Sequence, residues 1–255
     1  VNEIHEAFEN PKSLEVRAVF LDISKAFDKV WHEGLIYKLE QNGVSGNLLK
    51  LTRSYLHNRK QRVVINGSCS DFFSIESGVP QGSVLGPLLF LIYINDLEHG
   101  IESRIKFFAD DTMLFSIVHD SLTSANELNH DLLVIQKWAY LWKMEFNPDP
   151  SKQATELLFS CKKNKSVRPP LIFNNQVVKK VEYHKHLGLI LDSNLSFVNH
   201  INAKIALAKK NIGIIRHLSK HLPLQVLSQM YKLFVRSHFD YCDFIYHIPP
   251  FIRNS

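Results

Sequence analysis

Two adjacent aspartates, Asp110 and Asp111, interrupt the apolar run formed by residues 106–115. Carboxylates that are partly removed from water repel each other and carry a desolvation cost, so a proton or a metal ion must neutralise them. A third acid, Asp22, directly follows residues 18–21, which have the composition of a buried strand. Oxygen ligands of this kind suit a hard cation such as Mg²⁺. The three acids therefore predict a divalent-metal site, and an ordinary Asp-rich hairpin turn is the alternative for the adjacent pair.

Between the two acidic segments lies a loop rich in glycine and proline, residues 77–87, which changes abruptly into an apolar stretch. Its glycines allow a substrate or another backbone to approach closely. Gly86 and Pro87 are typical of a helix start, because proline loses no needed hydrogen bond at the first helical position. Gln81 is the polar side chain of this loop with the longest reach. For the apolar residues that follow, we expect a plain core helix.

The elements that must position these residues follow from hydrophobic periodicity. The pattern predicts helices over residues 31–41, 46–56, 87–97, 121–142, 198–221 and 224–246. It predicts strands that end at Asp22 and flank Asp110, and further strands over residues 61–67, 71–75, 154–160 and 171–178. A Gly-Ser turn is expected between the strands at 61–67 and 71–75. Strands and helices are mixed up to residue 192, and only helices are expected after it, which indicates an α+β domain followed by a helical one.

Composition narrows the class of protein. The chain has 255 residues, 45% of them hydrophobic and 22% charged, so a main domain plus a smaller one is expected. The net charge of +5 and the pI near 9.0 favour a polyanionic partner. Three scattered cysteines indicate no disulfide framework and no zinc motif. The longest apolar run is too short to span a bilayer, so no membrane partner is expected. Because the first residue is Val1, we expect a piece of a longer protein.

Three segments, residues 20–32, 78–87 and 108–111, resemble in order and spacing the A, B and C motifs of reverse transcriptases. The tetrad Phe-Ala-Asp-Asp and the run Ser-Val-Leu-Gly-Pro are similar to those of jockey-like non-LTR retrotransposons. Residues 142–148 resemble the start of motif D, and residues 186–192 resemble motif E. The resemblance implies an α+β polymerase palm, with a split βαβ, ferredoxin-like sheet and helices on one face. Partial fingers and a C-terminal helical thumb complete the implied architecture.

The implied domains are a palm with partial fingers over residues 1–192 and a partial thumb over residues 193–255. The implied reaction is nucleotidyl transfer from a dNTP to a DNA primer 3′-hydroxyl on an RNA template. Two Mg²⁺ ions, or Mn²⁺ in their place, would stabilise the attacking and leaving oxygens. By resemblance, Asp22 and Asp110 are the bridging catalytic ligands, Asp111 is a supporting carboxylate, and the backbone carbonyl of Ile23 is a further ligand.

The resemblance also implies residues that bind the substrates. Phe27 would lie under the incoming sugar, where its ring would collide with a 2′-hydroxyl; a plain core phenylalanine is the alternative. Gln81 and Gly82 would contact the template–nucleotide pair. Lys25 would approach the triphosphate, and a solvated charge is the alternative. The substrate class is therefore expected to be deoxynucleoside triphosphates.

Motif D departs from the family pattern. Relatives place a lysine three residues after the asparagine of Asn-Pro, whereas here Lys152 follows Asn147 by five residues, with a second proline between them. Lys152 is the candidate general acid for the leaving pyrophosphate, and a solvated loop lysine is the alternative. Four cations of the expected thumb are candidates for contacts with duplex phosphates, or serve only solubility: Lys204, Lys209, Lys210 and Arg216.

Two other readings stay open at this point. One is a catalytically inactive, nucleic-acid-binding remnant, because the fingers strands that normally hold the triphosphate lie upstream of motif A. The other is a retron or group II intron-type reverse transcriptase. We expect the chain alone to bind primer-template weakly and to polymerise little. For the parent element, an intracellular location is expected, in a cytoplasmic ribonucleoprotein and in the nucleus. The sequence does not specify an oligomeric state.

Overall fold

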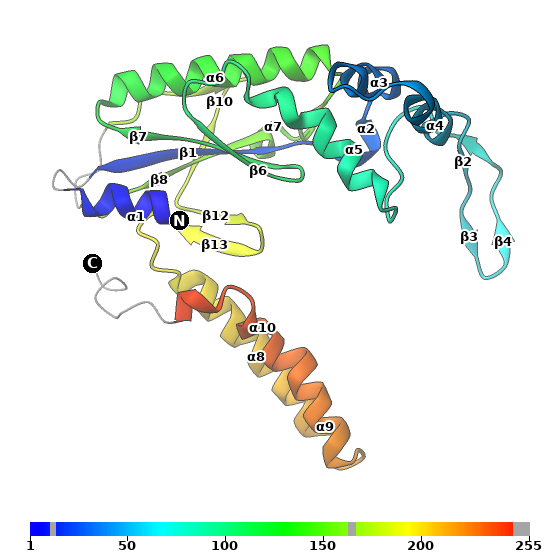
Figure 1. Cartoon of the computed structure of the whole chain (residues 1–255). Helices are drawn as coiled ribbons and strands as arrows, with labels where there is room; N and C mark the ends of the chain where they lie inside the picture. Colours follow the sequence, from blue (N-terminus) through cyan, green and yellow to red (C-terminus); the bar gives the residue numbers. More distant parts are fainter. Residues whose placement is uncertain (11–13, 163–166, 247–255) are drawn as a thin grey trace. The chain divides into compact units, whose positions relative to one another are not determined.

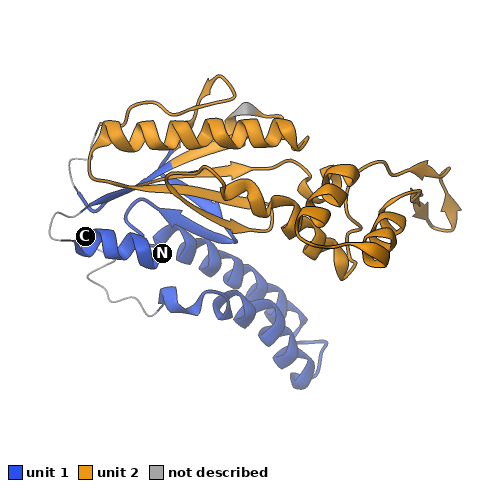
Figure 2. Ribbon diagram, turned by 45° about the horizontal axis from the view of Figure 1, so that its top comes forward, with its two compact units in different colours: residues 1–16, 157–165, 181–255 blue, residues 17–156, 166–180 orange. Residues whose placement is uncertain are grey.

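The computed structural model describes residues 1–10, 14–162 and 167–246 and has a mixed α+β fold (Figure 1). The chain divides into two compact units, which are coloured separately in Figure 2. Unit 1 comprises residues 1–16, 157–165 and 181–255, and unit 2 comprises residues 17–156 and 166–180. The predicted boundary between residues 192 and 193 stays a prediction.

A five-stranded sheet organises the fold. Its strands lie in the order β11 (Lys179–Val181), β8 (Ala154–Phe159), β1 (Glu15–Asp22), β7 (Asp111–Val118) and β6 (Arg104–Phe108). Strands β6 and β7 form an antiparallel hairpin in which Phe108 pairs with Asp111. Although β6 precedes β7 in the chain, β7 lies between β6 and β1. This insertion is the split βαβ arrangement, so the predicted α+β class is confirmed.

Strand β1 has the pattern of a central strand. Residues 15–21 are all buried, and only Asp22 at its end is exposed. A strand that is covered on both faces gains from a continuous apolar run rather than from strict alternation. The sequence therefore forces the first exposed carboxylate to the end of the strand.

Unit 2 contains the helices on which the site is built. They are α2 (Ala26–Lys29), α3 (His32–Gln41), α4 (Gly46–Leu56), α5 (Leu85–Ile94) with its 3₁₀ extension η1 (Asn95–Glu98), α6 (Ser121–Leu141) and α7 (Pro150–Gln153). Helix α6 covers one face of the sheet (Figure 1). The predicted boundaries of α3, α4 and α6 hold to within one residue. Helix α5 begins two residues earlier than predicted, and Pro87 is accommodated in its first turn, where backbone N–H groups have no helical acceptor.

A narrow two-stranded ribbon projects from α4 (Figure 1). It consists of β2 (Lys60–Gln61), β3 (Val64–Ile65), β4 (Ser68–Cys69) and β5 (Phe73–Ser74). Strand β2 pairs with β5, and β3 pairs with β4. The predicted Gly-Ser turn is wrong: the turn residues are Asn66 and Gly67, with φ of 50° and 84°. Two consecutive positive φ angles match the type I′ turn that tight hairpins prefer.

The stretch predicted as one strand over residues 171–178 is also a hairpin. It forms β9 (Ile172–Phe173) and β10 (Gln176–Val177), which pair antiparallel. Asn174 and Asn175 between them have φ of 48° and 61°, a conformation that asparagine tolerates better than most residues. Periodicity alone did not distinguish this short hairpin from a continuous strand. The basic turn expected around residues 162–165 lies largely outside the described residues.

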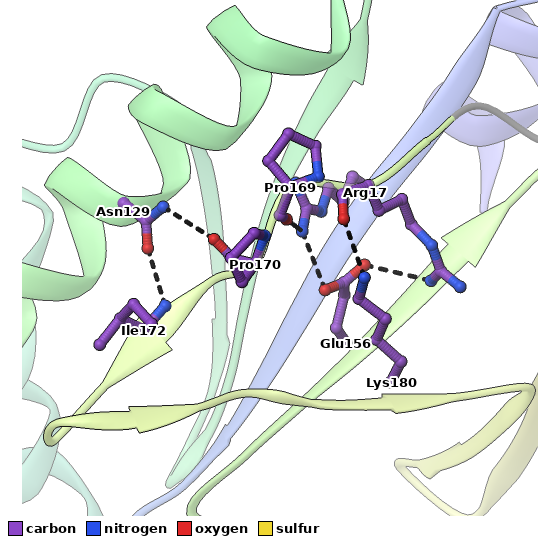
Figure 3. Close-up of polar contacts among 8 residues, drawn as sticks. Arg17, Asn129, Glu156, Pro169, Pro170, Ile172 and Lys180 are labelled. Carbon is purple, nitrogen blue, oxygen red and sulfur yellow. Dashed lines mark hydrogen bonds and ion pairs between the residues drawn. The ribbon is translucent and has the colours of Figure 1, made fainter.

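A buried ion pair joins two central strands of unit 2 (Figure 3). A guanidinium nitrogen of Arg17 on β1 donates to Glu156 on β8 at 3.0 Å, and their side chains are 2% and 0% exposed. Arg168 reaches the other oxygen of the same carboxylate at 3.1 Å. Lys180 in turn donates to the backbone carbonyl of Arg168 at 2.9 Å. The carboxylate of Glu156 therefore has cationic partners on both oxygens, as a buried charge requires.

Unit 1 contains a hairpin and a set of helices. The elements are α1 (Asn2–Glu9), the antiparallel pair β12 (Tyr183–His186) and β13 (Leu189–Asp192), α8 (Val198–Leu218), α9 (Leu224–Tyr231), the π-helix η2 (Lys232–Arg236), α10 (Ser237–Asp240) and the 3₁₀ helix η3 (Asp243–Tyr246). The predicted single helix over residues 224–246 is wrong, because the backbone turns at Cys242, where φ is 55°. Among the described residues, the helices are too short or too polar to span a bilayer.

Candidate active site

The predicted catalytic acids lie on neighbouring strands. Asp22 ends β1, Asp111 begins β7, and Asp110 lies in the β6–β7 turn, where Ala109 has a φ of 53°. In Figure 1 this turn lies at the end of the sheet at which β1 leads into α2. All three acids are exposed. The topology therefore brings their backbone positions to one end of the sheet.

The side chains are not gathered into a ready-made metal centre. Within the described ranges, no group of three or more His, Cys, Asp or Glu side chains is arranged to hold a metal ion. A shared-metal distance between Asp22 and Asp110 thus stays a prediction. The donor set itself fits Mg²⁺, because exposed carboxylates supply hard oxygen ligands and the ion takes much of its coordination from water and substrate phosphates.

A short segment before α7 pairs with the chain directly after Asp22. Ile23 forms an isolated antiparallel bridge with Phe146. The bridge consists of hydrogen bonds from Asn147 N–H to the Asp22 carbonyl at 3.0 Å and from Ser24 N–H to the Glu145 carbonyl at 2.8 Å. It engages the carbonyl of Asp22 rather than that of Ile23. The bridge therefore leaves the Ile23 carbonyl compatible with its predicted role as a ligand.

Phe27 is half-buried on the short helix α2. Its ring stacks on that of Phe90 in α5, with centroids 4.5 Å apart and an interplanar angle of 24°. One face of the ring is therefore fixed by packing. Lys25, which precedes α2, is exposed and has left-handed backbone angles. Both predicted alternatives for Phe27, a barrier beneath the sugar and a core residue, are compatible with this contact.

The glycine-rich loop is docked onto the segment that follows Asp22. The N–H of Gly78 donates to the carbonyl of Val30, and that of Val79 to the carbonyl of Phe27, both at 2.8 Å. A buried ring nitrogen of His32 lies 2.8 Å from the Gly78 carbonyl. A Cβ at Gly78 would lie 2.8 Å from the carbonyl oxygen of Asp28. Because there is no room for a side chain, this position requires glycine.

The predicted template contacts lie at the exposed tip of this loop. The amide nitrogen of Gln81 donates to a carboxylate oxygen of Asp28 at 2.8 Å. Gly82 is exposed and has a φ of 77°. The loop thus presents Gln81 and Gly82 on the same side of unit 2 as Asp28.

A cavity of about 700 Å³ opens beside Gln81. Lys25, Arg59 and Lys60 line it together with Asp28 and Glu76. Within the described part of the chain, none of these three cations forms an ion pair with a carboxylate. Sequence reasoning missed Arg59 and Lys60, because basic residues shortly after the predicted helix that ends at residue 56 are ordinarily solvated.

Lys152, the candidate general acid, is paired with a neighbour. Its ammonium lies 3.2 Å from a carboxylate oxygen of Asp149. Hydrogen bonds from Ser151 and Lys152 lower the pKa of Asp149, so this carboxylate stays ionised. The role of Lys152 in proton transfer stays a prediction.

The four predicted thumb cations lie on helix α8, and three of them are exposed while Lys204 is half-buried. At about 100° per residue, Lys209 and Arg216 lie roughly 20° apart around the helix axis. Lys204 and Lys210 are directed about 100–140° away from both. Only one pair therefore shares a face, and a duplex contact by all four cations from one side is not favoured by this geometry.

Comparisons with known proteins agree with the motifs. The family model described as reverse transcriptase (RNA-dependent DNA polymerase) matches residues 3–191. The RNA-directed DNA polymerase from the mobile element jockey of Drosophila melanogaster is 33% identical over 211 residues, which are 79% of this chain and 22% of that protein. The probable polymerase of the Drosophila melanogaster transposon BS is 31% identical over 73% of this chain and 21% of its own length. The chain belongs to the reverse transcriptase family.

The chain spans about a fifth of the length of these relatives. Among solved structures, apo telomerase from Candida tropicalis has a TM-score of 0.48 and 13% identity over 74% of this chain and 36% of that chain. Telomerase from Candida albicans, in complex with a fragment of telomeric RNA, has a TM-score of 0.49 and 13% identity over 94% of this chain and 42% of that chain. The family assignment rests on the sequence matches.

Proposed function

We propose that this chain forms the catalytic core of an RNA-directed DNA polymerase from a non-LTR retrotransposon. The observation that carries the proposal is the position of Asp22 and Asp110 at one end of two neighbouring strands in a chain of this family. In the proposed reaction, the primer 3′-hydroxyl attacks the α-phosphorus of a dNTP. A new P–O bond forms, and the bond to the pyrophosphate breaks.

Asp22 and Asp110 would hold the divalent ions, with Asp111 and the carbonyl of Ile23 as further oxygen ligands. When bound, such ions would stabilise the charge that develops on the attacking and leaving oxygens. Phe27 would set the floor of the sugar pocket because Phe90 supports its ring. Gln81, released from Asp28, would contact the template–nucleotide pair.

The cavity beside Gln81 supports single-stranded nucleic acid as the partner. Three cations that line it, Lys25, Arg59 and Lys60, form no ion pair with a carboxylate of the described residues and suit a phosphate backbone. The adjoining ribbon exposes Phe72 and Phe73, which are 60% and 65% exposed. Aromatic side chains next to a basic groove are typical of surfaces that stack unpaired bases. We propose that the RNA template passes along this surface toward Gln81.

Primer extension tests the proposed function. The chain, and the same chain extended on its N-terminal side, are assayed with an RNA template, a DNA primer, dNTPs and Mg²⁺. We expect robust extension by the longer form and a loss of at least about a hundredfold on Asp110→Asn or Asp22→Asn, because each acid is a proposed metal ligand. Asp240→Asn, an exposed acid on α10, is the matched control.

Two outcomes would contradict this scheme. Extension by Asp110→Asn at the rate of the unaltered protein would remove the acid pair from catalysis. Retained binding of RNA with no extension by either form would favour the inactive, nucleic-acid-binding remnant.

A further inference from the structure

Asn147 contacts Asp22 twice. Its backbone N–H donates to the carbonyl of Asp22 at 3.0 Å, and its side-chain amide nitrogen donates to a carboxylate oxygen of Asp22 at 2.7 Å. The two residues are 125 positions apart in the sequence. Asn147 is therefore hydrogen-bonded to both the backbone and the side chain of Asp22, the proposed metal ligand.

The orientation of the Asn147 side-chain amide is fixed by a hydrogen bond to its oxygen atom. Its oxygen accepts a hydrogen bond from the backbone N–H of Asp149 at 3.0 Å. Because only the oxygen can accept that bond, the NH₂ group must face Asp22. Asp149 then caps the short helix α7 by accepting from Ser151 N–H at 3.0 Å. The turn that contains the second proline thus aims a hydrogen-bond donor at Asp22.

An asparagine that served the turn alone would not need its amide nitrogen. Aspartate accepts the same backbone hydrogen bond and is equally suited to such turns. At position 147, however, an aspartate would place a second carboxylate within about 3 Å of Asp22, where like charges repel. The donor toward Asp22 is therefore the feature that distinguishes asparagine at this site.

We propose that Asn147 is a positioning residue that holds the carboxylate of Asp22 in the rotamer that binds the divalent ion. This inference rests on the proposed function. One hydrogen bond occupies a single lone pair of the carboxylate, and the other oxygen and the remaining lone pairs stay available to a cation. Partners that orient a metal ligand from behind typically change metal affinity by about 10–100-fold when they are removed.

The same geometry gives the altered motif D a role. Lys152 pairs with Asp149 at the surface, and in this structure the group of the segment 147–152 that contacts Asp22 is the Asn147 amide. The amide is oriented by the turn within this segment, through the N–H of Asp149. The departure from the family spacing therefore has a structural consequence at Asp22.

Cation binding by the purified chain tests the inference without an activity assay. The probe is Tb³⁺, a hard cation that takes oxygen ligands and binds carboxylates without a triphosphate, with affinity measured by isothermal titration calorimetry. Asp22→Asn defines the part of the binding that depends on Asp22. Asn147→Leu removes the donor at nearly constant volume, and Asn147→Ser keeps an acceptor for the Asp149 N–H but no longer reaches Asp22. We expect both Asn147 variants to weaken Tb³⁺ binding about tenfold, at the lower end of such effects.

Asn129 provides the matched control. Its amide also bridges two groups, donating to the Pro170 carbonyl at 3.2 Å and accepting from Ile172 N–H at 2.8 Å, and neither partner is a proposed metal ligand (Figure 3). Asn129→Leu should lower the melting temperature and leave Tb³⁺ affinity within about twofold, well below the effects expected for ligand-orienting partners.

The outcomes separate the inference from the proposed function. Wild-type Tb³⁺ affinity in folded Asn147→Ser, together with weakened binding in Asp22→Asn, overturns the positioning role and leaves the catalytic assignment intact. Unchanged binding in Asp22→Asn itself overturns both. An equal loss in Asn129→Leu and Asn147→Leu also overturns the positioning role, because the effect would then follow stability rather than contact with Asp22.

Discussion

The ring of Phe27 lies almost parallel to that of Phe90, with centroids 4.5 Å apart, and so cannot retreat toward α5. Phe90 is fully buried and belongs to the main hydrophobic core. A group that enters against the other face of Phe27 would therefore meet a ring with firm support. Firm support is what distinguishes a steric barrier from a deformable apolar contact, because a rigid wall excludes a larger substrate by a clash.

Phe27→Ala should raise the incorporation of ribonucleotides relative to deoxynucleotides. Loss of one close apolar contact changes discrimination by about 10–200-fold. We therefore expect the kcat/KM for a dNTP, divided by that for the matching rNTP, to decrease by a factor within this range. Phe90→Leu keeps the ring of Phe27 but weakens its support, and an intermediate ratio is expected. Steady-state primer extension with each nucleotide provides the measurement. Unaltered discrimination by folded Phe27→Ala would make Phe27 a core residue only.

Glu156→Gln should destabilise the protein strongly. The change removes the charge that neutralises Arg17, whose side chain is 2% exposed. Leaving one buried charge without its partner costs about 3–5 kcal/mol. Glu33→Gln is the matched control, because the pair of Glu33 and Arg53 is about half exposed and such pairs contribute at most about 1 kcal/mol.

Urea-induced unfolding, followed by circular dichroism, measures the free energy of unfolding of Glu156→Gln and of Glu33→Gln. The double variant Arg17→Met with Glu156→Leu should lie closer to the wild type than Glu156→Gln does, because an apolar pair of similar volume avoids the buried charge. A Glu156→Gln protein as stable as the Glu33→Gln protein would show that the buried pair contributes no more than an exposed one.

The sequence predicted the parts of this fold that local patterns determine. The apolar run that ends at Asp22 required a central strand, and the long periodic segments gave α3, α4 and α6 nearly to the residue. The pairing of Arg17 with Glu156 was not predictable, because two charged residues inside apolar strands are recognised as partners only when strand order is known. The expected strand at 171–178 is a hairpin because Asn174 and Asn175 form a turn, which hydrophobic periodicity does not register.

In the candidate site, too, local sequence patterns predicted some residues, and contacts between distant segments determine the others. Motif spacing identified Asp22, Asp110 and Gln81, because these positions lie on conspicuous apolar or glycine-rich patterns. The contact of Asn147 with Asp22 depends on a bridge between segments far apart in sequence, so no local pattern indicates it. Arg59 and Lys60 were missed because a basic run is ordinarily solvated, and only the cavity gives it a specific position.

The stability of the protein should depend on pH through Lys38. Its ammonium is buried, lies 2.5 Å from a carboxylate oxygen of Asp96 and sits 3.6 Å from the centre of the Trp142 ring. Burial lowers the pKa of Lys38 to about 8 from its ordinary 10.5, although Asp96 opposes the shift. At pH values between 8 and 10.5, the unfolded chain binds more protons than the folded chain. The contribution of the lowered pKa of Lys38 to the free energy of unfolding is therefore fully present above pH 10.5 and is lost as the pH falls through 8.

Comparison of the wild type with Lys38→Met isolates this contribution. The free energy of unfolding of the wild type, relative to that of the variant, should rise by up to roughly 3 kcal/mol from pH 7.5 to 10.5. Burial raises the pKa of Tyr93, which contacts the same lysine, to about 12, so ionisation of the unfolded tyrosine lowers stability above about pH 10. Both proteins contain Tyr93, so this contribution cancels in the difference between them. A difference that stays constant over this range would show that the pKa of Lys38 is not lowered.

The cavity cations should control the salt dependence of RNA binding. If Arg59 and Lys60 contact phosphates of a single strand, each contact releases counterions, and the slope of log K against log salt is about −0.7 per phosphate. Arg59→Ala with Lys60→Ala should therefore weaken binding of an unstructured oligoribonucleotide and make the slope less negative by about 1.4. Lys137→Ala, an exposed lysine on α6, should leave the slope unchanged. Fluorescence anisotropy between about 50 and 200 mM salt measures the slope, and equal slopes for the double variant and the wild type would exclude this cavity from the RNA path.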